Sequence, residues 1–283
     1  MTAAAGEVTL RKLLGKDYQP GAHNGAARLN PLLKEVAESG LCIVDPDRMR
    51  VRLDTSVQFY SNQRTYLPNT VFYRNFSASG VSNALFTTGP ASDDVDFVTG
   101  MDLCLGTLNM WGDVATTRLE GHHFKFYAHD SRVYQTDFLN HFKGAATFAR
   151  GDRNIWEDVR SFTPDLDPGG DTETAAAGFR ISKGKYFRFR RFIAIGPNDQ
   201  AMLVLPMSDN GTETIENCGY EDGYVESYRG KLCTVGASQN GGPVTNFLGG
   251  VYKSYMRRIR GKSTRYGVRV VADGSTRKNT IHD

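Results

Sequence analysis

This sequence of 283 residues contains few motifs that indicate a metal site, a redox site or a targeting segment. Four cysteines stand singly at positions 42, 104, 218 and 233, without the Cys-x-x-Cys spacing of zinc or redox sites. No apolar run approaches the roughly eighteen residues that a membrane helix needs. Residues 1–16 lack the basic and apolar segments of a secretory signal. The sequence therefore predicts no membrane span and no signal peptide.

Catalytic motifs are missing as well. There is no Gly-x-Ser-x-Gly, phosphate loop, dinucleotide fingerprint or kinase set, and the acidic segment 165–173 lacks the order of an EF-hand loop. Four of the six histidines cluster in one window, at His122, His123, His129 and His141. If residues 121–128 form a strand, His122 and His123 face opposite sides and cannot ligate the same ion. We therefore predict no catalytic residue, no metal and no cofactor.

Phenylalanine, tyrosine and glycine are abundant, with 16, 13 and 30 residues, which favours strands and turns. Helical spacing is clearest near the N-terminus. Val8 to Leu14 form one apolar stripe, and a second helix is predicted to begin at an Asn30 cap with Pro31 in its first turn and to end at Gly40.

Strand patterns dominate from Met49 onward. Apolar or aromatic residues alternate or run together in segments 49–53, 57–60, 70–76, 95–98, 124–128, 186–195, 201–205 and 266–271. The turn-rich loop 196–200 predicts a hairpin between 186–195 and 201–205, with Arg191 as a bulge. Short helices are predicted at 137–142 and 152–162. We find no internal repeat, which argues against solenoids and propellers.

These patterns predict a mainly β protein. Its body is an antiparallel β-sandwich or is barrel-like, with two short N-terminal helices, and an α+β C-terminal part stays open. Residues 1–45 form a helical N-terminal arm and residues 46–283 a β-rich body, with a domain boundary proposed in the acidic loop 163–177.

Charge is distributed in blocks. Residues 180–198 hold six basic residues and no acid, residues 252–278 hold nine basic residues and one acid, and residues 152–173 hold seven acids and two basic residues. The basic blocks predict a surface for assembly or for a polyanion such as nucleic acid. The predicted surface residues are Arg180, Lys183, Lys185, Arg188, Arg190, Arg257, Arg258, Arg260 and Lys262. In the assembly interpretation, the acidic loop of one copy meets the basic strand of the next.

The C-terminal quarter resembles C-type-lectin-like domains of the formylglycine-enzyme and phage tropism type. The resemblance rests on Gly236-Ala237-Ser238, Gly241-Gly242 and Gly267-Val268-Arg269-Val270, while Gln239 stands where those domains have a tryptophan. It implies a ligand-binding scaffold whose loop between Ser238 and Thr264 contacts a partner.

Together these features predict a non-enzymatic structural protein that self-assembles, such as a virion capsid or tail component. It would form a homo-oligomer, contact other structural proteins of the same particle and reside in a virion or the cytoplasm, with nucleic acid open as a further partner. Two alternatives remain: a ligand- or receptor-binding module with a lectin-like C-terminal part, and a metal-dependent hydrolase centred on the histidines.

Overall fold

The computed structural model describes residues 6–75, 84–88, 97–110, 121–140, 147–163, 177–196, 200–204, 214–227, 231–237, 250–263 and 266–272. Two helices, α1 (Leu10–Leu14) and α2 (Gly25–Glu38), lie near the N-terminus. The remaining elements are strands in two large sheets. Among the described residues, no helix is long and apolar enough to cross a membrane.

Sheet A has fifteen strands. They are β1 (Glu7–Thr9), β2 (Cys42–Val44), β3 (Arg50–Leu53), β5 (Arg64–Tyr66), β6 (Val71–Arg74), β9 (Asp102–Asn109), β11 (Arg132–Leu139), β13 (Ile155–Glu157), β14 (Arg160–Phe162), β16 (Arg188–Arg190), β17 (Ile193–Gly196), β20 (Gly219–Glu221), β21 (Tyr224–Ser227), β24 (Tyr255–Arg257) and β25 (Arg260–Ser263).

Sheet B has eleven strands, counting those that pair off its main path. They are β4 (Val57–Phe59), β7 (Ala84–Thr88), β8 (Val98–Thr99), β10 (His122–His129), β12 (Thr147–Arg150), β15 (Ala177–Lys185), β18 (Gln200–Val204), β19 (Thr214–Glu216), β22 (Lys231–Ala237), β23 (Gly250–Tyr252) and β26 (Tyr266–Ala272).

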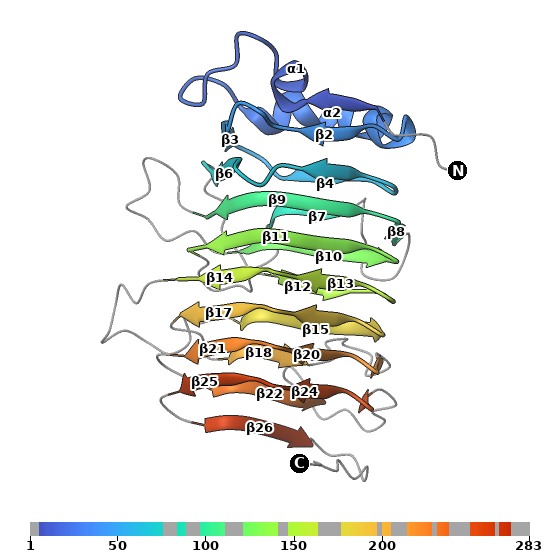
Figure 1. The fold of residues 1–283 in the computed structure, drawn as a ribbon, viewed down its shortest axis with the longest axis vertical. Coiled ribbons are helices and arrows are strands. Elements are labelled where there is room, and N and C mark those ends of the chain that lie inside the picture. The colour runs from blue at the N-terminus through green and yellow to red at the C-terminus, as the bar shows by residue number, and fades with distance from the viewer. Residues whose placement is uncertain are drawn as a thin grey trace.

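The chain winds as a coil in which each turn adds strands to both sheets. Strand β12 in sheet B is followed by β13 and β14 in sheet A, and β15 is followed by β16 and β17. Each strand pairs in parallel with its counterpart one turn later, as in β10 with β12 and β12 with β15. The coils stack from the N-terminal to the C-terminal end (Figure 1). The architecture is a parallel β-helix, which is a solenoid.

Stacked corners hold successive coils in register. Asp130, Arg153, Tyr186 and Asn217 occupy the same corner with φ of 50°, 55°, 58° and 53°. Each donates its backbone N–H to a carbonyl of the next coil; the acceptors are Asp152, Lys185, Glu216 and Tyr252, at 2.8 to 3.0 Å. A left-handed residue turns the chain sharply there, and its N–H is satisfied by the neighbouring coil.

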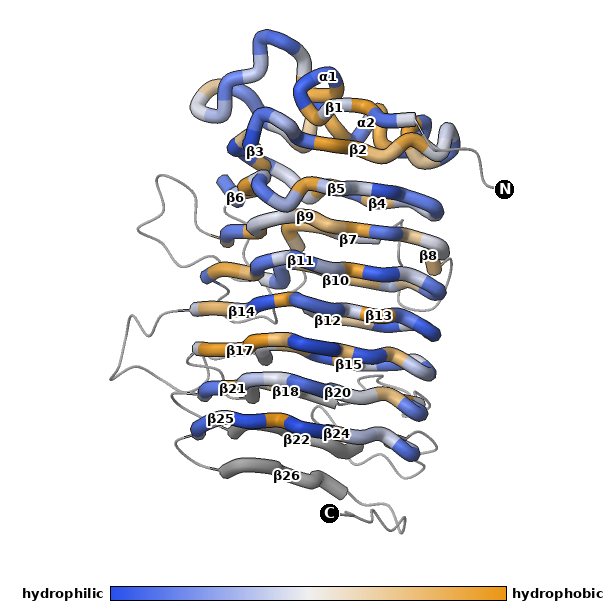
Figure 2. Tube along the Cα trace, in the orientation of Figure 1, coloured by the Kyte–Doolittle hydropathy of each residue, from blue (hydrophilic) through white to orange (hydrophobic). Residues whose placement is uncertain are grey.

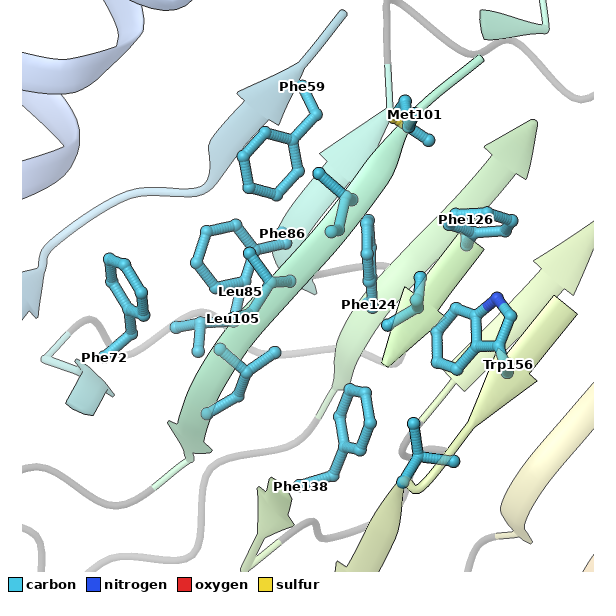
Figure 3. Close-up of a cluster of buried hydrophobic side chains, with 14 of the residues drawn as sticks. Phe59, Phe72, Leu85, Phe86, Met101, Leu105, Phe124, Phe126, Phe138 and Trp156 are labelled. Carbon is cyan, nitrogen blue, oxygen red and sulfur yellow. The ribbon is translucent and has the colours of Figure 1, made fainter. Parts of the chain in front are cut away.

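Polar and apolar residues follow one another along the strands of sheet A (Figure 2). The residues that turn inward build a core rich in aromatic rings (Figure 3). Trp156 is fully buried and lies 5.1 Å from Phe126 and 5.7 Å from Phe138, measured between ring centroids. Ring contacts continue through Phe187 and Phe189. Burial of these rings across coils is the main stabilising contribution to the solenoid.

Helix α2 covers the N-terminal end of the coil, where it packs beside β3 and β4 (Figure 1). Its apolar side, including Leu29 and Leu33, joins the same hydrophobic core as the strands. A covered end leaves fewer unpaired backbone groups at the edge of the stack.

The mainly β composition and the two N-terminal helices are confirmed, and Gly40 has the left-handed φ of 66° expected after the second helix. The cap of α2 is Asn24 instead of Asn30. Asn30 lies inside the helix, where its side chain donates to the carbonyl of Ser56 and accepts from the backbone N–H of Gln58. It therefore ties the helix to β4.

Four other predictions are corrected. The antiparallel sandwich or barrel gives way to a solenoid, because every described strand pair is parallel. The hairpin is absent: β17 and β18 lie in different sheets. Residues 137–139, 155–157 and 160–162 are strands, so helices predicted at 137–142 and 152–162 are wrong. Arg191, with φ of 46°, is a corner between β16 and β17. The division at residues 45 and 163–177 stays a prediction.

Candidate functional site

The outer face of sheet B presents an ordered group of basic and aromatic side chains on three successive coils. Along β10, β12 and β15, inward residues such as Phe126, Ala149 and Ile181 are fully buried in the core. The residues between them face outward, because side chains alternate along a strand. We call the outward set the basic–aromatic patch: Lys125, Tyr127, Phe148, Arg150, Arg180 and Lys183.

Strand register arranges the patch in two columns that run along the solenoid. Lys125 is opposite Phe148, which is opposite Arg180. Tyr127 is opposite Arg150, which is opposite Lys183. Neighbouring strands lie about 4.8 Å apart, so each column extends over about 10 Å; the first places a ring between two cations, and the second places a ring beside two successive cations.

Short contacts between cations and rings fix this arrangement. The Arg180 guanidinium lies 4.6 Å from the Phe148 ring centre, and Arg150 lies 5.2 Å from Phe148 and 5.4 Å from Tyr127. A cation over an aromatic face is attracted by the ring's quadrupole. Arg150 and Tyr127 are buried, whereas Lys125, Phe148, Arg180 and Lys183 are half-buried. The half-buried four have some exposed surface, although the Nε and Nη2 atoms of Arg180 are buried, and Arg150 positions the rings.

Two glycines follow the second column directly. Gly151 and Gly184 follow Arg150 and Lys183 directly, with φ of 116° and 135°. A Cβ on Gly151 would lie 1.7 Å from the carbonyl oxygen of Ala128. Only glycine fits this close approach of backbones, which occurs immediately after the second column.

The charge of sheet B is one-sided. Among its strands as the structure describes them, only β19 carries an acidic residue, Glu216, which pairs with Lys185 at 3.1 Å. The patch strands β10, β12 and β15 contain no aspartate or glutamate. Clustered cations on strands of this kind create a positive local potential.

The structure separates the nine predicted surface residues. Arg180 and Lys183 lie in the patch, Lys185 ends the same strand, and the other six lie on or beside sheet A strands β16, β24 and β25: Arg188, Arg190, Arg257, Arg258, Arg260 and Lys262.

Several of these cations pair within the chain. Glu221 pairs with Arg190 and Arg257 at 2.6 and 2.7 Å, and Asp222 pairs with Arg258 at 2.5 Å. The acidic partners in these pairs come from neighbouring coils of the same chain, whereas the assembly interpretation predicted acidic partners on another copy. Whether the nine residues form an assembly surface stays a prediction, and the acidic loop 164–176 lies outside the described residues.

Sequence reasoning missed Lys125, Tyr127, Phe148 and Arg150. These residues occupy alternate positions of their strands, and the residues between them are apolar. That alternation is visible in the sequence. What the sequence does not reveal is that strands separated by loops of different length stack with these positions side by side.

The histidines do not gather as ligands. The ring of His122 lies 5.4 Å from that of Phe148 between centroids, whereas the ring of His123 lies 5.6 Å from the buried ring of Phe138. The Nε2 of His123 is 2.6 Å from the carbonyl oxygen of Leu139, and the Nδ1 of His129 accepts a hydrogen bond from the backbone N–H of Asp152. The described residues contain no group of three metal-ligating side chains. His141 lies outside them.

Two outward carboxylates of sheet A have a spacing close to that of the catalytic carboxyl pair in inverting glycosidases. Glu157 and Glu221 are separated by β16, hence by about 10 Å between backbones. Inverting glycosidases place two carboxyl groups about 6.5–9.5 Å apart, and one needs a raised pKa. Burial raises the pKa of Glu221, but Arg257 and Arg190 outweigh it and hold that pKa below its usual range. Glu221 is therefore a cross-link between coils and is unsuited to act as a general acid.

Comparison with known proteins identifies the fold but no family. No family model and no curated protein matches the sequence. Among solved structures, the chain is similar to iota-carrageenase complexed to iota-carrageenan fragments, with a TM-score of 0.59 and 10% identity over 87% of this chain. The chain spans 60% of the length of the carrageenase chain that it matches. At this identity the likeness shows the parallel β-helix alone.

Two matches are weaker. A surface adhesin of Streptococcus pneumoniae matches with a TM-score of 0.40 and 8% identity, covering 92% of this chain and 81% of the adhesin. Tailspike protein 3 of bacteriophage CBA120 matches with a TM-score of 0.27 and 8% identity, covering 95% of this chain and 60% of the tailspike. At these scores the two likenesses add nothing to the fold.

These findings contradict two predictions. The first, a self-assembling virion capsid or tail component, rested on short aromatic-rich strands, N-terminal helices, opposed charge blocks and the lack of site chemistry; the chain instead has the fold found in a carrageenase. The second, that the chain is not an enzyme, rested on missing motifs, yet the structure with the TM-score of 0.59 is an enzyme. On a solenoid, the absence of sequence motifs does not exclude an active site, because the residues of a site come from different coils. The lectin-like resemblance stays a prediction, and residues 238–249 of its loop lie outside the described part of the chain.

Proposed function

We propose that the chain binds an anionic polysaccharide across the basic–aromatic patch of sheet B. The observation that carries the proposal is the clustering of cations and rings on three stacked coils, Lys125–Phe148–Arg180 beside Tyr127–Arg150–Lys183. The likeness to a carrageenase bound to polysaccharide fragments supports the same class of ligand.

The chemistry of each group fits such a ligand. Arginine donates charge-assisted hydrogen bonds to carboxylate and related oxyanions, and lysine supplies a mobile point charge. Phe148 is half-buried and offers a flat apolar surface to the C–H groups of a sugar ring. Because the patch continues from coil to coil, it suits a ligand that repeats along its own length.

Calorimetric titration tests the proposal with three polymers of matched length: a sulfated galactan, a polyuronate and neutral dextran. We expect the charged polymers to bind and dextran not to bind. The affinity should fall as salt rises, since binding releases counterions from the polyanion and this release becomes less favourable at higher salt.

Variants identify the surface. Arg180→Ala should weaken binding about tenfold or more, because one charge-assisted hydrogen bond contributes about 1.5–3 kcal/mol. Lys125→Ala and Phe148→Ala should also weaken it. The matched control is Arg188→Ala, a half-buried arginine of sheet A on the coil that contains Arg180, which should leave the affinity unchanged. Equal losses for Arg180→Ala and Arg188→Ala would contradict the proposal, as would equal affinity for DNA and for the charged polysaccharides.

A second candidate function is cleavage of the bound polysaccharide. It is favoured by the likeness to an enzyme that is complexed to fragments of a polysaccharide. The test incubates the chain with each polymer that binds and follows chain length by gel filtration and new ends by a reducing-sugar assay. A fall in polymer length that Arg180→Ala abolishes would support cleavage at the patch; unchanged length after prolonged incubation would contradict it.

A further inference from the structure

A charge pattern of four residues recurs on four successive coils of sheet A. Each segment has an inward apolar residue, two adjacent charges of one sign, and then an apolar residue or glycine. The segments are Trp-Glu-Asp-Val at 156–159, Phe-Arg-Arg-Phe at 189–192, Tyr-Glu-Asp-Gly at 220–223 and Met-Arg-Arg-Ile at 256–259. Their first two residues are opposite one another in strand register. Acidic and basic layers therefore alternate from coil to coil.

The interior layers are bonded on both sides. Glu221 pairs with Arg190 on the preceding coil at 2.6 Å and with Arg257 on the following coil at 2.7 Å. In the basic layer before it, Arg191 pairs with acids of the preceding coil. The last basic layer differs, because Arg257 and Arg258 pair with acids of the preceding coil alone and both are exposed. A guanidinium has five N–H donors, so these pairs leave donors for a further acidic layer.

The backbone at the corner within each segment shows the same interruption. The N–H of Asp158, of Arg191 and of Asp222 each donates to a carbonyl of the following coil, at 3.0 to 3.1 Å. Arg258 is the fourth residue of this corner column, with a left-handed φ of 52°. Lys253, with φ of 48°, ends the other corner column. The N–H groups of Arg258 and Lys253 have no acceptor in the part of the chain that the structure describes.

The hydrophobic core is less covered at this end. Phe189 and Tyr220 are fully buried, whereas Met256, which follows them in register, is half-buried. In the same way Phe192 is buried and Ile259 is half-buried. Strands β24 and β25 lie near the C-terminal end of the coil (Figure 1) and, among the described strands, pair on one side only, with β20 and β21. An edge with unpaired backbone groups is a template for another strand.

We propose that this edge of sheet A binds an acidic strand of a partner protein, with the order apolar–acid–acid–apolar of the interior acidic layers. The strand adds in parallel beside β24. Its carboxylates bond to Arg257 and Arg258, its backbone accepts from the N–H of Arg258, and its apolar residues cover Met256 and Ile259.

The chain itself does not supply this strand. Its two segments of the required order, 156–159 and 220–223, lie inside the coil and are paired on both sides, so a second copy has neither to offer. Residues 264–283 contain two acids, Asp273 and Asp283, which are not adjacent. Residues 250–263 hold five basic residues and no acid, so two copies meeting at these ends would repel each other. The edge is separate from the basic–aromatic patch, so the inference is independent of polysaccharide binding.

Fluorescence anisotropy with the full chain and a labelled peptide tests the proposal. The peptide has the sequence of residues 214–227, with serine at the position of Cys218, because within the chain these residues follow a basic layer. We expect saturable binding that falls at least tenfold when lysines replace Glu221 and Asp222 of the peptide. A shuffled peptide of the same composition is the control for net charge alone.

Two variants of one residue separate strand pairing from side-chain contact. The N–H of Tyr255 and the carbonyl of Arg257 bond to the preceding coil, so the N–H of Met256 between them points to the open edge. Met256→Pro removes that N–H and keeps the bonds to the preceding coil. Met256→Ala shortens the same side chain and keeps the N–H. We expect the peptide to bind Met256→Pro at least tenfold more weakly than Met256→Ala, with circular dichroism establishing that both are folded.

Amide hydrogen exchange of the wild-type chain, followed by NMR, tests the contact without a variant. Bound peptide should slow exchange at Met256 and Arg258 at least tenfold and leave Tyr255 and Arg257 unchanged. The proposal is overturned if the peptide does not bind at millimolar concentration, or if the shuffled peptide binds equally well. It is also overturned if bound peptide leaves the exchange of Arg258 unchanged, or if folded Met256→Pro and Met256→Ala bind it alike.

Discussion

Replacing Trp156 measures how far the aromatic core stabilises the coil. The side chain is fully buried, and its ring lies within 6.4 Å of the rings of Phe126, Phe138, Phe187 and Phe189. A buried tryptophan contributes roughly 150–250 Å² of surface. At about 25 cal/mol per Å², its loss amounts to roughly 4–6 kcal/mol before the alanine methyl and local relaxation are counted. Trp156→Ala should therefore lower the free energy of unfolding by about 3–5 kcal/mol.

Trp156→Phe separates packing from hydrogen bonding. The indole Nε1 is buried and has no hydrogen-bond partner among the described residues. Removing that N–H relieves a desolvation penalty of about 1–3 kcal/mol, which offsets much of the lost ring area. We expect Trp156→Phe to be at least about 2 kcal/mol more stable than Trp156→Ala.

Urea unfolding followed by far-ultraviolet circular dichroism measures both variants, and gel filtration as a second probe checks that the transition is cooperative. If Trp156→Ala lies within about 1 kcal/mol of the wild type, the residue is not at the centre of a packed core. If Trp156→Phe is the less stable of the two, a phenyl ring does not pack at this position, because both variants lack the indole N–H.

Three further predictions concern local geometry and ionisation. Gly151→Ala should destabilise the fold strongly in the same urea assay, because its Cβ would overlap the carbonyl of Ala128; wild-type stability would refute the corner geometry. The folded-state pKa of Glu221 is held below its ordinary 4.5 by Arg257 and Arg190 against the effect of burial. Its stabilising contribution is thus present above pH 4.5 and declines as pH falls below it, and Glu221→Gln should flatten that decline in acid unfolding. Burial raises the pKa of Cys218 to about 12, so mass spectrometry after iodoacetamide treatment at pH 8 should find Cys218 unmodified in the folded chain and modified in urea.

The strands were largely predictable, because a two-residue rhythm needs only local sequence. The rhythm at Phe187 and Phe189 marks β16 correctly, and the irregularity at Arg191 marks a true break in the strand. Its cause is a left-handed corner instead of a bulge. Local sequence does not distinguish the two, since both interrupt alternation with one residue.

The solenoid was missed because its coils differ in length. One coil spans 23 residues from Asp130 to Arg153, and another spans 36 from Asp222 to Arg258. A search for a fixed period does not detect such a repeat. The predicted hairpin failed for a related reason: a turn-rich loop serves equally well to carry the chain from one sheet to the other.

The candidate site was found in part. Arg180 and Lys183 stood out because they belong to a basic block, whereas Lys125 and Arg150 are single cations in aromatic strands. Their proximity depends on which strands stack, and that is a property of the whole coil.

Protection of lysines from acetylation tests the central claim most directly. The chain is acetylated briefly with and without saturating sulfated polysaccharide, and each lysine is quantified by mass spectrometry. The account predicts protection of Lys125 and Lys183, with unchanged labelling of Lys262 on sheet A and of Lys34 on α2. Protection of Lys262 without Lys125 and Lys183, or binding that protects none of the four, would contradict it.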